Sequence, residues 1–479
     1  MKNNRRTKII ATLGPAADRP GVLEGIIKAG ADVVRMNFSH GSLADHEARF
    51  KAVREIAAQC QREVSILADL QGPKIRIAKF QAGKITLKVG QPFTLDPALD
   101  DAAGDETQVG IHYKELCNDV SNGDILLLDD GRLELTVRSV ADNKIHCEVR
   151  VGGTLSNNKG INRLGGGISA KALTDKDRAD IKSAVALGAD FIAVSFPRTA
   201  DDIKLARLLI EAEGGDQGIV AKIERAEAVV AIDEIIAASD AVMVARGDLG
   251  VEIGDAELPG VQKHIIRRAR DLNKAVITAT QMMESMIHNL LPTRAEVFDV
   301  ANAVLDGTDA VMLSAETATG DHPEKVIEAM ARVCIGAEKE PRAKTSRHRI
   351  DQTFARCDEA IAMSAMYIAN HLDIKAIVAL TESGSTPLWM SRIRSGIPIY
   401  ALTRHQHTRR MVTLYRGVYP LAFDITEQTR ESVNKEAIET LKAYGAVQDG
   451  DRIILTKGDL VGINGGTNAI KIMEVGKVF

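Results

Sequence analysis

Charged and polar side chains stand at the ends of short apolar runs in this chain. In the segment AKIERAEAV, Lys222 and Glu224 are two residues apart on an expected strand, so their side chains point to the same side. Asp248 follows a glycine in ARGDLGVEIG, where the backbone can approach a ligand closely. A cation beside a carboxylate is typical of a site where a metal ion meets an anionic substrate. The simpler alternative for the Lys222–Glu224 pair alone is a structural salt bridge.

These residue types suit phosphoryl transfer. Two carboxylates, Glu224 and Asp248, are enough to hold Mg²⁺, which takes few protein ligands and completes its shell with water and phosphate oxygens. Phosphoryl transfer needs alignment and positive charge around the transferring group more than covalent work by the protein. Arg35, Arg76 and Lys222 can supply that charge.

Eight short runs rich in Val and Ile must position these residues. Helical stretches such as LADHEARFKAVREIAAQC separate most of the runs, and this alternation predicts a closed (β/α)₈ TIM barrel. The runs are 8–14, 32–41, 64–73, 190–198, 218–225, 240–250, 274–283 and 309–317.

Polar residues follow seven of these eight runs, at the ends where this fold carries its chemistry. Any one of them alone is explained as a turn residue whose polar group has a hydrogen-bond partner. The whole set favours convergence on one anionic, metal-binding pocket. Its members are Arg35, Asn37, Ser39, Asp69, Ser195, Lys222, Glu224, Arg246, Asp248, Thr280, Ser314 and Glu316.

Two further units are expected. Over 72–168 the pattern changes to alternating strands and tight turns, with a hairpin signal at Asp130-Gly131, which predicts a small β-barrel lid domain. This lid interrupts a catalytic barrel made of 1–71 and 169–340. After Glu340, strands at 376–384, 398–404 and 451–458 alternate with helices, which predicts an open C-terminal α/β domain over 341–479.

Composition narrows the class of protein. The chain has 479 residues, 45% of them hydrophobic and 26% charged, with a net charge of −4. This balance indicates a globular protein without nucleic acid or an anionic membrane as partner. Five scattered cysteines favour a reducing cytoplasm without disulfides or a zinc site. We expect neither a signal peptide nor a membrane span, since no apolar run approaches the roughly 20 residues that cross a bilayer.

Several motifs together resemble the pyruvate kinases from end to end of the chain. They are VRMNFSHG, LQGPKIR, AKIERAEAV, VMVARGDLG, TATQMMESM, PTRAEVFDVANAVLDG and VMLSAET. The resemblance implies transfer of the phosphoryl group of phosphoenolpyruvate to ADP, giving pyruvate and ATP in the last step of glycolysis. It also implies Mg²⁺ as cofactor, with Mn²⁺ as an alternative, a regulatory C-terminal domain and a cytoplasmic homotetramer.

The resemblance assigns roles to individual residues. Lys222 would stabilise the charge in transit, and Thr280 would lie on the path that delivers a proton to the enolate. The implied catalytic and substrate-binding residues are Arg35, Arg76, Lys222, Gly247, Asp248, Thr280, Ser314 and Glu316. The implied metal ligands are Glu224 and Asp248, and the implied nucleotide-binding residues are Asn37, Ser39, His40, Arg76 and Lys159.

One departure concerns the monovalent cation. Potassium-dependent members resemble Gly-Pro-Glu-Ile-Arg where this chain has Gly-Pro-Lys-Ile-Arg at 72–76. In the family, K⁺ lies at the positions of Asn37, Ser39, Asp69 and the carbonyl of Leu70. Because a lysine ammonium can place the same charge in that region, we predict that Lys74 makes catalysis independent of K⁺, as in the bacterial, lysine-containing type. The alternative is an exposed lysine that merely varies.

A second site is indicated by TESGST (381–386), a polar loop between a strand and a helix start. Its backbone amides and the hydroxyls of Thr381, Ser383, Ser385 and Thr386 can cradle a phosphate. In the family this loop and the one matching GDLVGINGGTN (458–468) hold allosteric sugar phosphates. Many relatives have Arg at the position of Ser385, so we expect activation by a sugar monophosphate or AMP. A helix cap without a ligand is the alternative.

Two other functions compete with this interpretation. One is a carbon–carbon lyase or mutase that acts on phosphoenolpyruvate, but such barrels lack a β lid carrying Arg76 and Lys159. The other is a catalytically dead sensor of sugar phosphates. The presence together of Arg35, Lys222, Glu224, Asp248 and Thr280 argues against a dead sensor.

Overall fold

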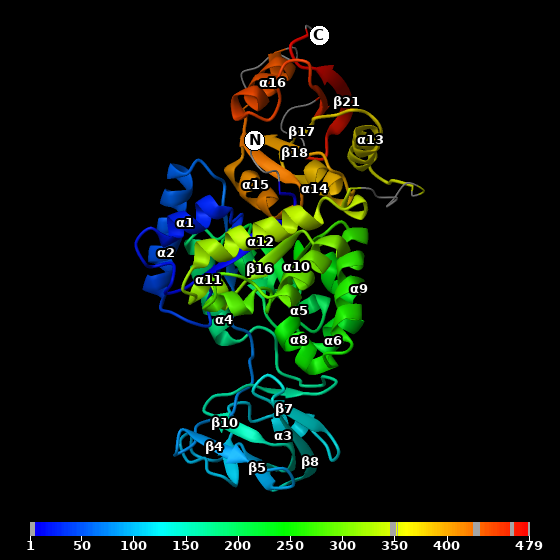
Figure 1. The fold of residues 1–479 in the computed structure, drawn as a ribbon. Helices are drawn as coiled ribbons and strands as arrows, with labels where there is room; N and C mark the ends of the chain where they lie inside the picture. Colours follow the sequence, from blue (N-terminus) through cyan, green and yellow to red (C-terminus); the bar gives the residue numbers. More distant parts are fainter. Residues whose placement is uncertain (1–4, 345–350, 352, 425–431, 460–463, 478–479) are drawn as a thin grey trace.

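The computed structural model describes residues 5–344, 351, 353–424, 432–459 and 464–477. Three units follow one another along the molecule, with a β-rich lid at one end, a barrel in the middle and an α/β unit at the other end (Figure 1). The lid and the C-terminal unit therefore meet opposite ends of the barrel.

The central unit is a closed barrel of parallel strands in the order β1-β16-β15-β14-β13-β12-β3-β2. All eight expected runs form its strands, and the prediction of a TIM barrel is confirmed. Six of the strands are buried at every residue, as is usual when helices cover one side of a parallel sheet and packed side chains fill the other. The strands are β1 (Lys8–Leu13), β2 (Val33–Asn37), β3 (Ser65–Asp69), β12 (Phe191–Val194), β13 (Gly218–Ile223), β14 (Ala241–Ala245), β15 (Ala275–Ala279) and β16 (Ala310–Leu313).

Helices surround the barrel, and several begin at strong capping signals. Thr174 and Asp177 form a capping box at the start of α4, and Thr293 and Glu296 form one at the start of α10. The helices of this unit are α1 (Val22–Ala29), α2 (Leu43–Gln59), α4 (Asp175–Ala186), α5 (Ala200–Ala212), α6 (Ala226–Val230), α7 (Ile232–Ala238), α8 (Arg246–Ile253), α9 (Leu258–Asp271), η1 (Glu284–Ile287), α10 (Arg294–Asp306), α11 (Ala315–Ala318), α12 (Pro323–Ala337) and η2 (Pro341–Ala343).

The lid lies between β3 and β12 in the chain and has its own hydrophobic core. Its main sheet has the order β11-β7-β8-β9-β5-β6, and β10 pairs with β4 beside it. The expected inserted β lid is confirmed with one difference, because the sheet curls without closing into a barrel. Its edge strands β6 and β11 are only three residues long. The elements are β4 (Lys84–Leu87), β5 (Pro92–Asp96), β6 (Gln108–Gly110), α3 (Leu116–Asp119), β7 (Ile125–Leu128), β8 (Leu133–Ala141), β9 (Lys144–Val151), β10 (Gly153–Ser156) and β11 (Ile161–Arg163).

Two stems side by side join the lid to the barrel. The amide of Ile77 donates to the carbonyl of Lys159 at 2.9 Å, and the amide of Ile161 donates to the carbonyl of Ile75 at 3.0 Å. Gly72 begins the outgoing stem with φ +66°, and a Cβ there would lie 2.7 Å from the Cβ of Ser195. Only glycine therefore fits this turn, which starts the lid at the barrel mouth.

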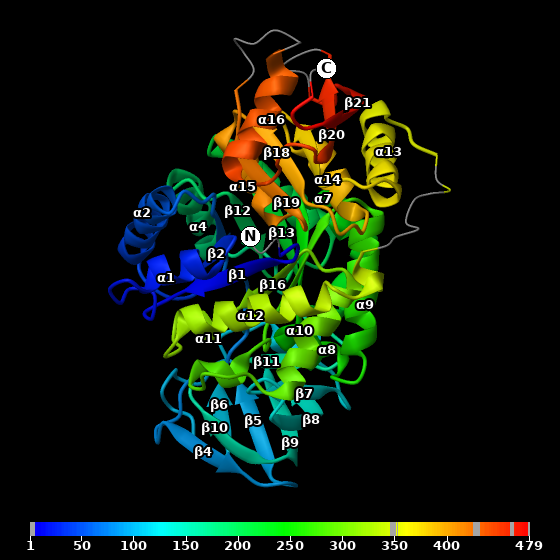
Figure 2. The same cartoon turned by 45° about the horizontal axis from the view of Figure 1, so that its top comes forward.

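The C-terminal unit is an open sheet in the order β19-β18-β17-β20-β21, with β21 antiparallel to its neighbour. Ile377 and Ala379 of β17 belong to the core that α13 completes, whereas Ala376 and Val378 pack with α16 on the other face (Figure 2). The expected open α/β domain is confirmed. Its elements are α13 (Cys357–His371), β17 (Ala376–Leu380), α14 (Ser385–Arg392), β18 (Ile399–Thr403), α15 (Gln406–Met411), η3 (Val412–Leu414), β19 (Val418–Ala422), α16 (Ser432–Tyr444), β20 (Arg452–Gly458) and β21 (Thr467–Glu474).

The barrel and the C-terminal unit share one hydrophobic core. Ile10, Ala241 and Ala275 of the barrel belong to the same buried cluster as Val412 and Leu414 of the C-terminal unit. This contact covers the amino-terminal end of the barrel, so the end that carries the polar strand tips faces the lid. No helix in the described part of the chain is long and apolar enough to cross a membrane.

Candidate active site

A connected polar network occupies the barrel mouth beneath the lid. Arg35 extends from β2 and its Nε lies 2.5 Å from Asp69 Oδ2 at the end of β3. Lys222 extends from β13, with its Nζ 3.3 Å from Asp69 and 2.9 Å from Glu224. Ser195 accepts a hydrogen bond from Lys222 at 2.7 Å. The structure thus brings together residues from four different strands.

Two neighbouring carboxylates favour the charged form of Lys222. Burial by itself would lower the pKa of this ammonium, but the carboxylates of Asp69 and Glu224 outweigh burial and raise it. The same contacts act on Asp69, where burial would raise the pKa of the carboxyl and the charges of Arg35 and Lys222 lower it. The side chains of Arg35 and Lys222 are each only 12% exposed, so the field that they create is weakly screened by water.

The carboxylate pair fits a divalent cation. Glu224 accepts a 2.8 Å hydrogen bond from the amide of Phe196, which fixes one of its oxygens. Burial raises the pKa of Glu224, and the nearby charge of Asp248 raises it further, against the opposing effect of Lys222. A divalent cation would relieve that repulsion. Two carboxylates suffice for Mg²⁺, because this ion takes few protein ligands and completes its shell with water and phosphate oxygens.

Thr280 sits in a strained turn after β15. Its φ is +69°, which is unusual for a β-branched residue, and its hydroxyl accepts a 2.8 Å hydrogen bond from the amide of Gly247. Strain of this kind persists where the surroundings hold it. Arg246 provides that hold, because it donates to the carbonyl of Thr280 at 2.6 Å and pairs with Asp299 at 2.6 Å.

Glu316 also holds the turn after β15. Its carboxylate accepts hydrogen bonds from the amides of Met283 at 3.2 Å and Ser314 at 2.6 Å. The side chain is buried, so the oxygens that it directs toward these amides hold the loop after β15 against the loop after β16.

The expected nucleotide residues on the barrel lie on one turn after β2. Asn37 accepts a 3.1 Å hydrogen bond from the amide of Ser39, and His40 is exposed at the end of the turn. Lys176 donates to the carbonyl of Phe38 at 2.8 Å and so ties this turn to α4.

Arg76 and Lys159 lie on the two stems of the lid, next to each other. Arg76 donates to the carbonyl of Asn158 at 2.9 Å, and Lys159 pairs with Asp129 at 2.7 Å. Among the described residues, neither of these two cations forms an ion pair with the network of Lys222. The structure thus keeps the lid cations apart from the barrel cations.

Lys74 pairs with a carboxylate of the barrel mouth. Its Nζ lies 3.1 Å from Asp248 Oδ1, and its expected role as a substitute for K⁺ in the region of Asn37, Ser39, Asp69 and Leu70 stays a prediction. Asp69 itself is paired with Arg35 and Lys222. The carbonyl of Leu70 accepts from Ser195 at 2.7 Å.

The expected effector loop lies between β17 and α14. The hydroxyl of Thr381 accepts from the amide of Gly384, and the hydroxyls of Ser383 and Ser385 lie 2.9 Å apart. Thr386 is buried, with its hydroxyl 2.9 Å from that of Thr467. This contact joins the loop to the later segment 458–468, of which 460–463 lie outside the described residues.

Sequence reasoning gave no role to two residues that contact the site. Ser195 and Arg246 stood among the polar strand tips, yet neither received a role, although Ser195 binds Lys222 and Arg246 holds Thr280. Asp299, the partner of Arg246, lies on α10 in a different βα unit. Nothing in the local pattern around Asp299 signals this long-range contact.

Two family models match the chain. The model described as pyruvate kinase, barrel domain, matches residues 4–327, and the model described as pyruvate kinase, alpha/beta domain, matches residues 359–473. The matches cover both the barrel with its lid and the C-terminal unit, which argues against the lyase or mutase alternative.

Individual relatives agree over the full length. The chain is 59% identical to pyruvate kinase II of Salmonella typhimurium over 475 residues, covering 98% of this chain and 99% of that protein. It is 58% identical to the pyruvate kinase of Haemophilus influenzae over 458 residues, covering 95% and 96%. The crystal structure of a pyruvate kinase from Cryptosporidium parvum superposes with a TM-score of 0.90 at 35% identity, covering 98% and 96%. The chain therefore belongs to the pyruvate kinase family, and it is an enzyme that converts phosphoenolpyruvate to pyruvate with formation of ATP.

Proposed function

We propose that phosphoenolpyruvate binds at the barrel mouth with its phosphate between Arg35 and Lys222. The observation that carries this assignment is that the carboxylate of Asp69 pairs with both cations and so holds them next to each other. In the reaction a β-phosphate oxygen of ADP attacks phosphorus, and the bond from phosphorus to the enol oxygen breaks. Fixed positive charge around the equatorial oxygens stabilises that transition state.

Glu224 and Asp248 would hold the divalent cation that the family uses. Bound there, the cation would neutralise phosphate charge as a Lewis acid. The amide of Asp248, beside Gly247 at the start of α8, would bind the substrate carboxylate. The enolate left by transfer takes a proton at its terminal carbon to give pyruvate, and the hydroxyl of Thr280, oriented by Gly247, would lie on the path of that proton. Ser314 and Glu316 would position this turn.

The nucleotide would lie between the barrel and the lid. Asn37, Ser39 and His40 would line its barrel side, and Arg76 and Lys159 would reach its phosphates from the lid stems. Under this proposal 1–71 with 169–340 perform catalysis, 72–168 close over the site and 341–479 regulate it.

Lys74 leads to a prediction about potassium. We expect turnover of the enzyme to stay within about twofold when K⁺ is replaced by tetramethylammonium at fixed ionic strength, since Lys74 supplies a fixed unit charge at the mouth. Lys74→Glu should lower turnover on the order of tenfold or more without K⁺, and added K⁺ should restore much of it. Initial rates in a coupled pyruvate assay measure both effects.

Lys79→Glu, which changes charge on an exposed lysine of the lid, serves as the matched control. A large loss of wild-type turnover in tetramethylammonium would contradict independence from K⁺. Equal behaviour of Lys74→Glu and Lys79→Glu would contradict the role of Lys74.

The loop 381–386 supports regulation by a phosphorylated effector. We expect glucose 6-phosphate, ribose 5-phosphate or AMP to lower the half-saturating concentration of phosphoenolpyruvate several-fold. The hydroxyls of Ser383 and Ser385 bond to each other and can exchange that bond for one to a phosphate, whereas Thr386 is buried against Thr467. The Ser383→Ala/Ser385→Ala double variant should therefore lose the response, as measured by saturation curves with and without each effector.

Ser364→Ala removes an exposed hydroxyl from α13 of the same unit and should leave the response unchanged. A saturation curve that ignores all three compounds would defeat the proposed regulation.

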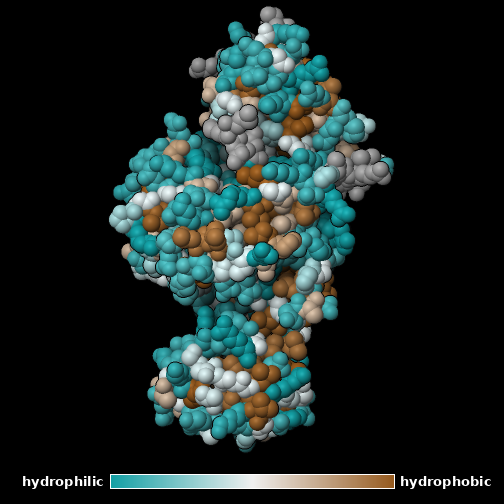
Figure 3. Space-filling view, in the orientation of Figure 1, coloured by the Kyte–Doolittle hydropathy of each residue, from teal (hydrophilic) through white to brown (hydrophobic). Residues whose placement is uncertain are grey.

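Assembly into a homotetramer in the cytoplasm completes the proposal. Apolar side chains gather on the barrel where α10 and α12 lie (Figure 3). Phe298 on α10 and Leu291 just before this helix are 70% and 72% exposed. Tyr367 and Leu372 form a second exposed apolar area at α13 of the C-terminal unit. Two such areas on different units suit two kinds of subunit contact. Sedimentation equilibrium measures the state directly.

A further inference from the structure

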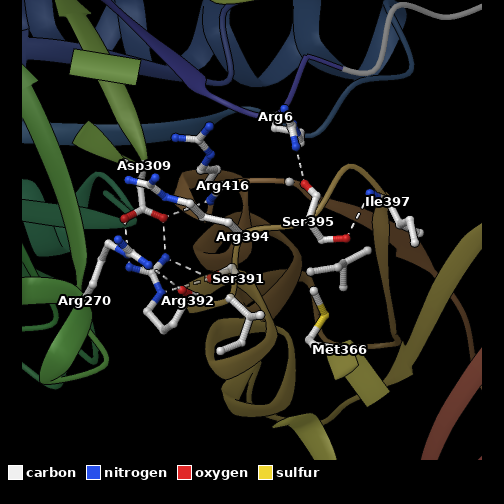
Figure 4. Close-up of a pocket in the computed structure, with 14 residues that line it drawn as sticks. Arg6, Arg270, Asp309, Met366, Ser391, Arg392, Arg394, Ser395, Ile397 and Arg416 are labelled. Atoms are coloured by element: carbon white, nitrogen blue, oxygen red, sulfur yellow. Dashed lines mark hydrogen bonds and ion pairs between the residues drawn. The ribbon is translucent and has the colours of Figure 1, made fainter. Parts of the chain in front are cut away.

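A small cavity lies between the barrel and the C-terminal unit, at the end of the barrel opposite the active site. Its volume is about 20 Å³, and guanidinium groups dominate its walls (Figure 4). These groups belong to Arg6, Arg270, Arg392, Arg394 and Arg416. Asp309 is the one carboxylate among the described residues that line the cavity.

Two of the five arginines have a carboxylate partner. Arg392 forms a two-pronged ion pair with Asp309, with one of its Nη atoms 2.8 Å from Asp309 Oδ2. Both side chains are only 1% exposed. Arg6 lies 3.6 Å from Glu338, which stands outside the cavity. Both of these carboxylates, Asp309 and Glu338, therefore already have an arginine partner.

The other three arginines contact backbone carbonyls. Arg416 donates to Val304 at 2.9 Å, and Arg394 donates to Leu305 at 2.8 Å. These carbonyls end helix α10, whose dipole offers only about half a negative charge. Arg270 donates to the carbonyl of Arg392 at 3.2 Å. No described carboxylate forms an ion pair with any of the three.

Asp306 does not form an ion pair with any of these three arginines. It lies at the end of α10, but its carboxylate pairs with Lys263 and accepts a hydrogen bond from the side-chain amide of Gln262. One buried and two half-buried guanidinium groups thus converge on a space where Asp309 is the one lining carboxylate among the described residues, and Arg392 already pairs with it.

Buried donors at the cavity also lack acceptors. One Nη atom of Arg416 and the Nε of Arg394 are buried without a hydrogen-bond partner. Arg416 is only 8% exposed. Burial, together with neighbouring arginines, lowers the pKa of both Arg270 and Arg416 to about 10. Uncompensated buried charge of this kind is costly to a fold, so a counter-charge is expected where the guanidinium groups meet.

The cavity limits what that counter-charge can be. A volume of about 20 Å³ holds one water-sized occupant and excludes an organic phosphate. A water molecule would satisfy a donor but would leave the positive charge in place. We propose that this cavity binds one inorganic anion of halide size, which joins the amino-terminal segment, the end of α10 and the segment 391–397 of the C-terminal unit.

Bromide is a direct probe of this site, because its anomalous scattering identifies it in a crystal. Crystals of the full chain soaked in sodium bromide should show an anomalous peak in the cavity, in contact with Arg416. A cavity that holds water alone, with bromide peaks only at the surface, would overturn the proposal.

A solution experiment tests the same site without crystals. Bromide is increased at the expense of gluconate, so that the ionic strength stays fixed. The melting temperature of the full chain should then rise with the bromide concentration and reach a plateau. Arg416→Met should abolish this saturable rise. Arg270→Met removes a single carbonyl contact and should move the midpoint of the rise to at least about tenfold higher bromide. This second variant still tests the proposal if Arg416→Met does not fold.

Arg268→Met removes the same charge from the same helix α9, but at an exposed position paired with Asp233. This control should respond to bromide as the wild type does. The same response in all four proteins, or no saturable response in the wild type, would contradict an anion at the arginine cluster.

Discussion

Replacing Lys222 by methionine is expected to lower kcat by about 10³-fold or more while the fold is retained. Methionine keeps most of the length of the side chain but removes the charge that lies between Asp69 and Glu224. Because this charge acts mainly on the transferring phosphoryl group, kcat should fall far more than the affinity for phosphoenolpyruvate. A coupled pyruvate assay with ADP and Mg²⁺, at saturating phosphoenolpyruvate, measures the loss.

The matched control is Lys204→Met on helix α5, since Lys204 is exposed and, among the described residues, forms an ion pair with Asp201 alone. It should retain wild-type turnover. Circular dichroism and the melting temperature of Lys222→Met show whether the fold survives. Near-normal turnover in a folded Lys222→Met enzyme would refute the role that we assign to this residue.

The second large effect concerns stability. Arg392→Met should destabilise the protein by about 3–5 kcal/mol, because it leaves the carboxylate of Asp309 buried and without its main partner. Arg392 also donates to the carbonyl of Lys274 at 2.6 Å, so the variant loses a contact between the C-terminal unit and the barrel. Differential scanning calorimetry should show a lower melting temperature for the transition that includes both units.

Arg268→Met again provides the comparison, because an exposed ion pair contributes at most about 1 kcal/mol. Adding Asp309→Asn to Arg392→Met removes the unpaired charge and should recover part of the lost stability. Equal melting temperatures for Arg392→Met and Arg268→Met would show that the buried pair does not support the contact between the two units.

Much of the fold was predictable because burial leaves a strong pattern. The barrel strands are continuous apolar runs, such as KIIATL at Lys8–Leu13, and all eight were recognised. The strands β19 and β21 were not predicted. Pro420 interrupts the first, and the second is an edge strand with exposed polar residues such as Lys471, so neither carries the signal of a buried strand.

The sequence indicated which residues meet at the barrel mouth but not the contacts that they make there. Strand tips identified Arg35, Asp69 and Lys222, and the structure connects them. The sequence could not place Lys74 on Asp248, since the two residues meet only when the first stem of the lid passes over α8. Contacts between distant segments depend on the assembled barrel, which local patterns do not encode.

The position of the lid also bears on how the chain folds. Leu67 of β3 pairs with Phe191 of β12, although the entire lid separates them in the sequence. Closing so long a loop of unfolded chain carries an entropic cost that slows folding. The two stems lie side by side, so a lid that folds early around its own core would bring the two strands together in advance. During synthesis the lid emerges before β12, and its early folding would therefore prepare the barrel to close.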